Sequence, residues 1–226
     1  MDTLTRSAMA ASDRYRLFLN DISAIYRNRI EIGRAFSRSG LDQATIIAGV
    51  FLNQESSFIQ DDVQRAAQMG RDDVLKRHAG NQTLESLDAS QHVSMLADDL
   101  RETLHSQVNR DLQAFARALR LASFNRSLGN HGSDSDPAFS YVDRASRKWA
   151  SHTLVKTSWR QILVFARIET AMLDMAKLGI KEFQIAHPSS DHRSNGIVIA
   201  PNELSIEDVR ESVFHPNSEA FLIPRE

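Results

Sequence analysis

The sequence predicts an α+β protein, with a mostly helical N-terminal region that includes one long helix, followed by C-terminal helices packed on a small β-sheet. Apolar residues recur every three or four positions over most of the chain before residue 180, which is the period of an amphipathic helix. Three short apolar runs then follow at 181–186, 196–199 and 219–223, and polar segments separate them. Runs of this kind are typical of strands.

The composition is that of an ordinary soluble globular protein. Of the 226 residues, 42% are hydrophobic and 25% are charged, with a formal net charge of −2 and a pI near 6.5. This balance lacks the strongly basic character of a dedicated nucleic-acid-binding protein, although a local basic patch is compatible with it. The sequence has no run of about 18 apolar residues, so we expect no membrane-spanning helix. The N-terminus lacks the apolar core of a secretory signal, so we expect a protein made in the cytoplasm.

The N-terminal part is expected to begin with a short arm and three helices. Residues 1–12 are small and polar and are expected to be mobile. Helices are then predicted at 12–34, 41–58 and 61–79, with Ser12 as the cap of the first. The third of these helices is much more polar than the other two.

The most regular predicted helix covers residues 90–123 and contains neither proline nor glycine. At 1.5 Å per residue it would be about 50 Å long, which suits a helical hairpin or bundle. Its apolar stripe is expected to face a core, and the alternative is that part of the stripe packs on another chain. The stripe consists of Val93, Leu96, Leu100, Leu104, Val108, Leu112, Phe115 and Leu119.

A polar segment, NRSLGNHGSDSDP, separates this helix from the rest of the chain. Its glycines, serines and aspartates, and its length, are unusual inside a compact domain and indicate a boundary. The predicted organisation is therefore a helical partner-binding region at 1–124, a linker at 125–138 and an α+β module at 139–226.

The module is expected to contain two helices and three strands. The helices are predicted at 139–158 and 159–178, and Gly179 would end the second. The polar connector LSIEDVRES before the last strand is expected to form at least one helical turn. The inward side of the second helix is expected to consist of Ile162, Leu163, Ala166, Thr170, Leu173 and Ala176.

Several short signals occur in a fixed order in this module. They are Glu169-Thr170 on the helix, the strand Phe183-Gln184-Ile185, the turn Asp191-His192-Arg193, the tripeptide His215-Pro216-Asn217 and the final run Phe221–Pro224. In order and punctuation they resemble the C-terminal module of phage head-morphogenesis proteins, minor capsid proteins of the Mu F-like family that are made in low copy with the portal. The resemblance covers about the last third of the chain.

The resemblance implies a non-enzymatic minor head protein of a phage or prophage, which associates with the portal and assists capsid assembly or genome packaging and delivery. Its partners would be the portal and capsid proteins of the same phage, with self-association and transient contact with DNA as further expectations. It would be found in the virion and, during assembly, in the host cytoplasm. No cofactor, metal or catalytic residue is expected. The positions that carry the family motif are Glu169, Thr170, Asp191, Arg193, His215, Pro216 and Asn217.

The chain departs from that family in having no cysteine. Many members carry cysteines just after the Asp-x-Arg turn and around the His-Pro-Asn tripeptide, where this chain has Ser194, Ser218 and Ala220. Disulfides and thiolate metal sites are excluded without sulfur. The junction between the turn and the terminal strand is therefore expected to depend on hydrogen bonds made by Asp191, Arg193, His215 and Asn217. Asp191 and Arg193 are expected to be largely buried.

An enzymatic alternative stays open because His187, Asp191, His192, Arg193 and His215 all belong to this module. Two histidines could act as base and acid in RNA cleavage while the arginine holds the phosphate, and a His/Asp metal site is also chemically admissible. Gly-rich nucleotide loops, a G-x-S-x-G elbow and an H-E-x-x-H motif are absent from the sequence. The main hypothesis is structural hydrogen bonding. A helical interaction module with an unknown partner is the third alternative.

Overall fold

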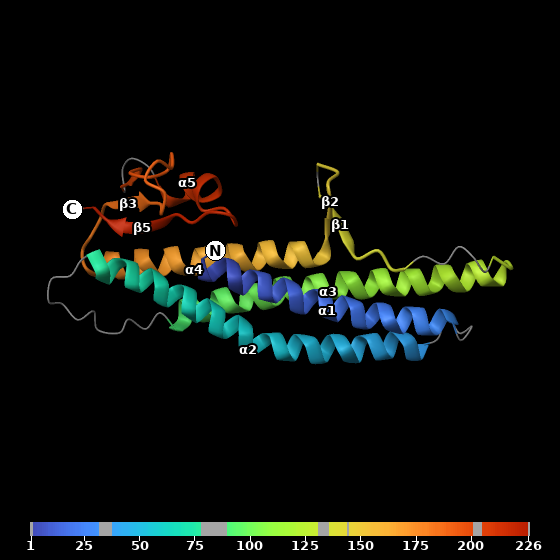
Figure 1. The fold of residues 1–226 in the computed structure, drawn as a ribbon. Coiled ribbons are helices and arrows are strands. Elements are labelled where there is room, and N and C mark those ends of the chain that lie inside the picture. Colours follow the sequence, from blue (N-terminus) through green and yellow to red (C-terminus); the bar gives the residue numbers. More distant parts are fainter. Residues whose placement is uncertain are drawn as a thin grey trace. The chain divides into compact units, whose positions relative to one another are not determined.

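The computed structural model describes residues 2–31, 38–77, 90–130, 136–143, 145–200 and 205–225. Long helices make up most of the chain, and two small antiparallel sheets lie in its C-terminal part (Figure 1). The predicted α+β class is therefore confirmed. Within the described ranges, no helix is long and apolar enough to cross a bilayer.

Contacts divide the chain into two compact units, and the division falls inside each of the four long helices. Unit 1 contains Met1–Ala8, Phe58–Leu100 and Thr157–Glu226, and unit 2 contains Met9–Ser57 and Arg101–Lys156. Unit 2 thus includes residues on both sides of the predicted linker. The expected separate folding of 1–124 and 139–226 stays a prediction, and residues 131–135 of the linker at 125–138 lie outside the described residues.

The first helix, α1, spans Thr3–Glu31 and begins well before the predicted start. The Asp2 carboxylate accepts a 2.6 Å hydrogen bond from the backbone N–H of Thr5, as an N-cap does. Ser12, the expected cap, lies inside the helix. The prediction of a mobile arm is wrong, because the first turns have a buried side built from small residues that give a weak apolar pattern: Leu4, Ala8 and Ala11.

The second helix, α2, spans Arg38–Arg77 as one element. The prediction of two helices, at 41–58 and 61–79, is wrong. Residues 59–61 contain neither proline nor glycine, and Ile59 is buried. Nothing in the local backbone chemistry therefore ends the helix there.

The third helix, α3, spans Ser90–Ser127 and confirms the predicted long helix, with an end slightly beyond residue 123. The predicted stripe is buried except at Leu112, which is half-buried. The core-facing interpretation is confirmed for the buried positions, and the alternative that part of the stripe packs on another chain stays a prediction.

Unit 2 contains a buried carboxylate, Asp111, which is 1% exposed. It accepts hydrogen bonds from the Tyr15 hydroxyl at 2.6 Å and from the Ser151 hydroxyl at 2.8 Å. Burial raises the pKa of Asp111, and these bonds partly oppose the rise. The carboxylate thus links α1 and α3 to Ser151, the first residue of the fourth helix.

A β-hairpin precedes the fourth helix. Strands β1 (Ser140–Val142) and β2 (Lys148–Ala150) pair antiparallel. The Asp143 carboxylate accepts hydrogen bonds from the backbone N–H of Arg147 at 2.9 Å and from the indole N–H of Trp149 at 3.1 Å. These two bonds are the main causes that lower the pKa of Asp143 to about 2. The aspartate therefore closes a turn where the apolar pattern had predicted a helix.

The fourth helix, α4, spans Ser151–Lys177. The prediction of two helices at 139–158 and 159–178 is wrong. The hairpin occupies the first half of the range 139–158, and the second half is the beginning of α4. Gly179 ends α4 as predicted, with a φ of 74° that favours glycine. Of the residues expected to face inward, Leu163, Ala166 and Thr170 are buried and Ile162 is half-buried, whereas Leu173 and Ala176 are exposed.

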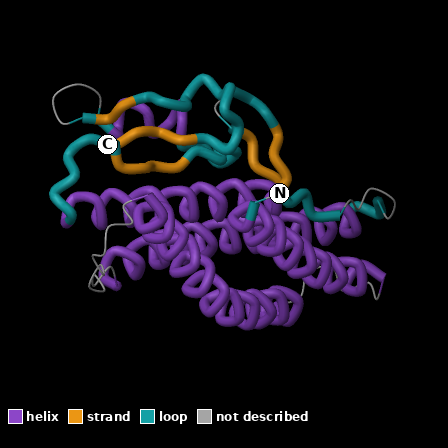
Figure 2. Tube along the Cα trace, turned by 60° about the vertical axis from the view of Figure 1, so that its left-hand side comes forward, coloured by secondary structure: helices purple, strands orange, loops and turns teal. Residues whose placement is uncertain are grey.

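A three-stranded antiparallel sheet follows α4 in unit 1. The central strand β3 (Phe183–Ala186) pairs with β4 (Val198–Ile199) on one side and with β5 (Phe221–Pro224) on the other, which confirms the three predicted strands. Helix α5 (Ile206–Val213), capped by Ser205, forms from the connector that was expected to be at least partly helical. Figures 1 and 2 show the sheet lying along the C-terminal part of α4.

Candidate functional site

The sheet brings the two main motif segments to one end of the module. Strands β3 and β5 run antiparallel with Ala186 opposite Phe221. The turn that contains 191–193 follows β3, and the tripeptide at 215–217 precedes β5. Both segments therefore lie at the same end of the sheet, although many residues separate them in the sequence.

Three histidines gather at this end. The rings of His187 and His192 stack with centroids 3.9 Å apart and planes 13° apart. Desolvation lowers the pKa of His192, and the charges of His187, Arg193 and His215 lower it further. The motif turn and the tripeptide are therefore close enough to interact electrostatically.

The backbone engages one nitrogen of each imidazole. In each case Nδ1 accepts a hydrogen bond from the N–H two residues further on, which fits a neutral ring with its proton on Nε2. The pairs are His187 with Ser189 at 3.1 Å, His192 with Ser194 at 3.3 Å, and His215 with Asn217 at 3.2 Å. The three rings therefore take part in local turns, with Nε2 left for other contacts.

We expect mild acid to weaken this end of the sheet. The lowered pKa of His192 means that the unfolded chain, whose imidazole titrates near 6.5, binds a proton more readily than the folded protein. The stabilisation is therefore present above about pH 6.5 and is lost as the pH falls through the lower folded-state pKa. Thermal unfolding from neutral to mildly acidic pH should show a smaller fall in Tm for His192→Phe than for the wild type. An equal fall in both proteins would contradict the prediction.

The expectation that Asp191 and Arg193 are buried is wrong, because both side chains are exposed. Asp191 accepts a hydrogen bond from the Ser190 hydroxyl at 3.2 Å. The structure shows no hydrogen bond from either side chain to residues 215–221, all of which are described. Asn195 closes the turn instead, since its amide donates to the carbonyl of Ser190 at 3.1 Å.

The terminal segment is held by α4. Arg160 is 4% exposed, and its guanidinium donates to the Ser218 carbonyl at 2.8 Å and to the Asp2 carboxylate at 2.7 Å. Gln161 donates to the carbonyl of Phe214 at 3.0 Å. Burial lowers the pKa of Arg160, and the Asp2 carboxylate opposes this effect. The guanidinium keeps its charge, because arginine is not deprotonated in proteins.

Arg167 adds a second link two helical turns further along α4. Its guanidinium lies 4.7 Å from the ring centroid of Phe221 in β5, and its Nε donates to Asp73 of α2 at 2.7 Å. Sequence reasoning assigned no role in the junction to Arg160 or Arg167. The available signal was that both lie on one helix face, on a helix rich in buried apolar residues.

We expect Arg160→Ala to lower the free energy of unfolding by about 1–3 kcal/mol, because it removes the guanidinium that donates to the Ser218 carbonyl and to one oxygen of the Asp2 carboxylate. Arg193→Ala should change it by less than about 0.5 kcal/mol, since that side chain is exposed. Chemical denaturation of both variants measures the two values. Equal losses would show that the turn, and not α4, holds the terminal segment.

The motif residues Glu169 and Thr170 of α4 take part in the packing of helices. The Glu169 carboxylate accepts a hydrogen bond from Arg210 of α5 at 2.9 Å and lies 2.8 Å from Nε2 of His92 on α3. The guanidinium of Arg210 also lies 3.9 Å from the centroid of the Phe165 ring. Thr170 is buried. Glu169 therefore joins three helices of unit 1.

Two pockets of unit 1 are both lined by Met172 and Ile206. The larger has a volume of about 450 Å³ and a mostly apolar wall that includes Phe183. The smaller, of about 130 Å³, is lined by Glu169 and Arg210. Their walls are suited to apolar side chains more than to a charged substrate.

The tripeptide at 215–217 and the three positions that carry cysteine in many head-morphogenesis proteins differ in burial. His215 and Asn217 are exposed and Pro216 is half-buried, whereas Ser194, Ser218 and Ala220 are all buried. In the part of the chain that the structure describes, no group of three or more histidine, aspartate or glutamate side chains is arranged to hold a metal ion.

Comparison of the chain with protein-family models, curated proteins and solved structures found no match.

Proposed function

We propose that this protein is a non-enzymatic minor head protein of a phage or prophage, which associates with the portal and assists capsid assembly or genome packaging and delivery. One observation carries the proposal. Strand β5, which follows His215-Pro216-Asn217, pairs with β3, which precedes Asp191-His192-Arg193. The resemblance to head-morphogenesis proteins implies a turn and a terminal strand held together, and this pairing is consistent with that architecture.

The positions that carry cysteine in many head-morphogenesis proteins also support the proposal. Ser194, Ser218 and Ala220 are buried, as a stapled junction would require. In place of sulfur, Arg160 binds the carbonyl of Ser218, and Arg167 lies over the ring of Phe221. Two arginines of α4 thus hold the terminal segment in a chain that has no cysteine to hold it.

The proposed partners are the portal and capsid proteins of the same phage, with self-association and transient DNA contact as further proposals. The proposed locations are the virion and, during assembly, the host cytoplasm. Quantitative mass spectrometry of gradient-purified particles should find the chain in low copy, and cross-linking should join it to the portal. Deletion of its gene should lower the yield of infectious particles. Absence from both particles and portal complexes would overturn the proposal.

A nuclease is the second candidate function, and the stacked His187 and His192 beside Arg193 favour it. With Nδ1 engaged by the backbone, the Nε2 atoms are the ones left for proton transfer. Purified protein should leave labelled RNA and DNA intact, with and without added divalent metal, if the head-protein proposal holds. Cleavage that disappears in both His192→Ala and His215→Ala would establish the nuclease instead.

A further inference from the structure

An apolar and basic surface lies on the C-terminal half of α3, within unit 2. Leu121, Phe124 and Leu128 are 57%, 59% and 64% exposed. Their spacings of three and four put them on one helix face, and the N–H of Leu128 still bonds to the carbonyl of Phe124 at 3.2 Å. Together with Arg117 and Arg120, these residues form what we call the α3 surface. It is separate from the buried stripe of the same helix.

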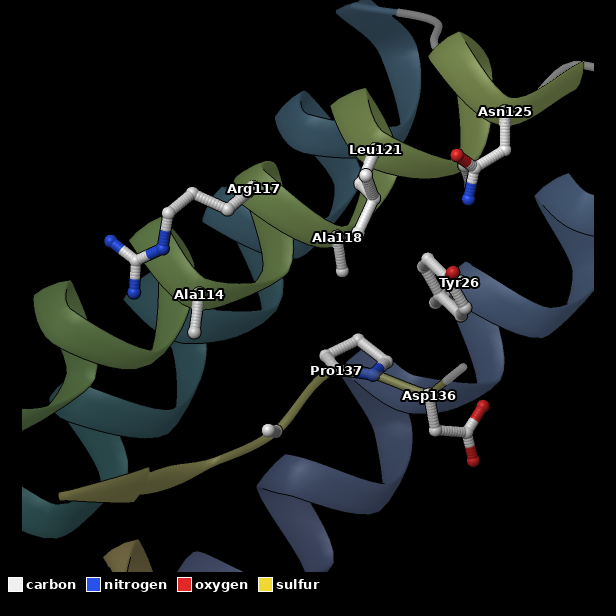
Figure 3. Close-up of a pocket in the computed structure, with 10 residues that line it drawn as sticks. Tyr26, Ala114, Arg117, Ala118, Leu121, Asn125, Asp136 and Pro137 are labelled. Atoms are coloured by element: carbon white, nitrogen blue, oxygen red, sulfur yellow. The ribbon is translucent and has the colours of Figure 1, made fainter. Parts of the chain in front are cut away.

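A pocket opens beside this surface (Figure 3). It has a volume of about 270 Å³ and is lined by Arg117 and Leu121 of α3, by Tyr26 of α1 and by Pro137. Figure 3 shows the side chains of Ala118, Tyr26 and Pro137 turned toward the same space. Small-molecule sites have volumes of about 300–1,000 Å³, so this pocket is better matched to an apolar side chain of a partner.

The charge around the pocket is positive. Between residues 112 and 130 the sequence contains three arginines and no acidic residue. Arg117 and Arg120 are exposed, and the structure shows no hydrogen bond or ion pair from either one to another described residue. The acidic group on the pocket wall, Asp136, is already paired with Arg27 at 3.0 Å. The surface therefore offers apolar contacts next to two cations.

We propose that the α3 surface binds an amphipathic helix of another protein that carries acidic side chains beside its apolar face. Anchors at three- and four-residue spacing are the pattern by which a helix engages an apolar surface, and complementary charge orients the encounter. The head-protein function is not a premise of this inference, which stands or falls on the surface alone.

Two other occupants fit the surface less well. Binding of a DNA duplex depends mainly on neutralising several phosphates with Lys and Arg, whereas this surface presents two exposed arginines. A two-fold contact with a second copy would bring two identical basic surfaces together, and residues 112–130 contain no acidic residue to pair with Arg117 or Arg120, so like charges oppose such a contact. An acidic partner avoids both difficulties.

The test uses the full chain and two synthetic helical peptides of about 20 residues. Both peptides carry leucines along one face, flanked by glutamates in one peptide and by lysines in the other. Fluorescence anisotropy should show at least about tenfold tighter binding of the glutamate peptide. Phe124→Ser combined with Leu128→Ser should lower that affinity at least about tenfold. Arg117→Glu combined with Arg120→Glu should reverse the preference between the peptides.

Leu17→Ser provides the matched control, because Leu17 is 62% exposed on α1 and lies outside the surface; it should leave the affinities unchanged. Circular dichroism checks that each variant is folded. Equal affinity for the two peptides, no binding of either, or an unchanged preference in the glutamate variant would overturn the proposal. Self-association lost in the Phe124→Ser, Leu128→Ser variant would assign the surface to a second copy and overturn it. Binding of duplex DNA through Arg117 and Arg120 would also overturn it.

Discussion

Gly70→Ala is expected to lower the free energy of unfolding by about 3 kcal/mol or more, although alanine is the better helix former. Gly70 of α2 packs directly on α4 within unit 1. A Cβ added there would lie 1.9 Å from the carbonyl oxygen of Arg167 and 3.2 Å from the backbone nitrogen of Ala171. Both neighbours are backbone atoms that cannot rotate away, so the two helices would have to separate. Guanidinium denaturation measures the loss.

Gly49→Ala, on the same helix, is the matched control. A Cβ added at Gly49 meets no atom within 4 Å, so the substitution should stabilise the protein by about 0.5–1 kcal/mol through helix propensity alone. The same chemical change should therefore have opposite signs at the two positions. A neutral or stabilising Gly70→Ala would show that α2 and α4 do not approach this closely.

Trp159→Ala is expected to lower the free energy of unfolding by about 3–5 kcal/mol. The side chain is 0% exposed and is among the largest fully buried groups of the protein. Its indole N–H donates to the Asp62 carboxylate at 3.0 Å. Truncation would therefore leave a large cavity, and it would also remove a donor from a buried carboxylate.

Two further variants separate these contributions. Trp159→Phe keeps most of the apolar volume and loses the N–H, so its cost should be intermediate. Trp149→Ala removes the only other tryptophan, which is half-buried in the hairpin, and should cost clearly less than Trp159→Ala. Denaturation curves in which Trp149→Ala is as costly as Trp159→Ala would contradict the burial of Trp159.

Local periodicity and punctuation predicted much of the fold. The long helix α3, the stop at Gly179 and the three strands of the sheet all appear where the pattern placed them. Each depends on features that neighbouring residues carry by themselves: an apolar repeat, a residue that tolerates positive φ, or a short apolar run between polar turns. The absence of cysteine likewise excludes sulfur-based links on composition alone.

Two of the errors occurred where a single polar contact overrides a weak local pattern. Asp2 caps α1 and binds Arg160, so the expected mobile arm is helical. Asp143 closes a hairpin inside a segment whose apolar spacing resembled a helix. Contacts of this kind depend on the geometry of one side chain. A hydrophobic pattern averaged over ten or more residues of sequence does not detect them.

The sequence by itself determined the fold class, the long helix α3, the three strands of the terminal sheet and the set of charged and histidine residues available near the terminal strand. Only the tertiary structure decided which of those residues hold it. Arg160 and Arg193 are chemically identical, but the fold buries Arg160 against Ser218 and leaves Arg193 in solvent. The energetic value of a charged group depends on its desolvation and on its partners, and both are properties of the packed chain.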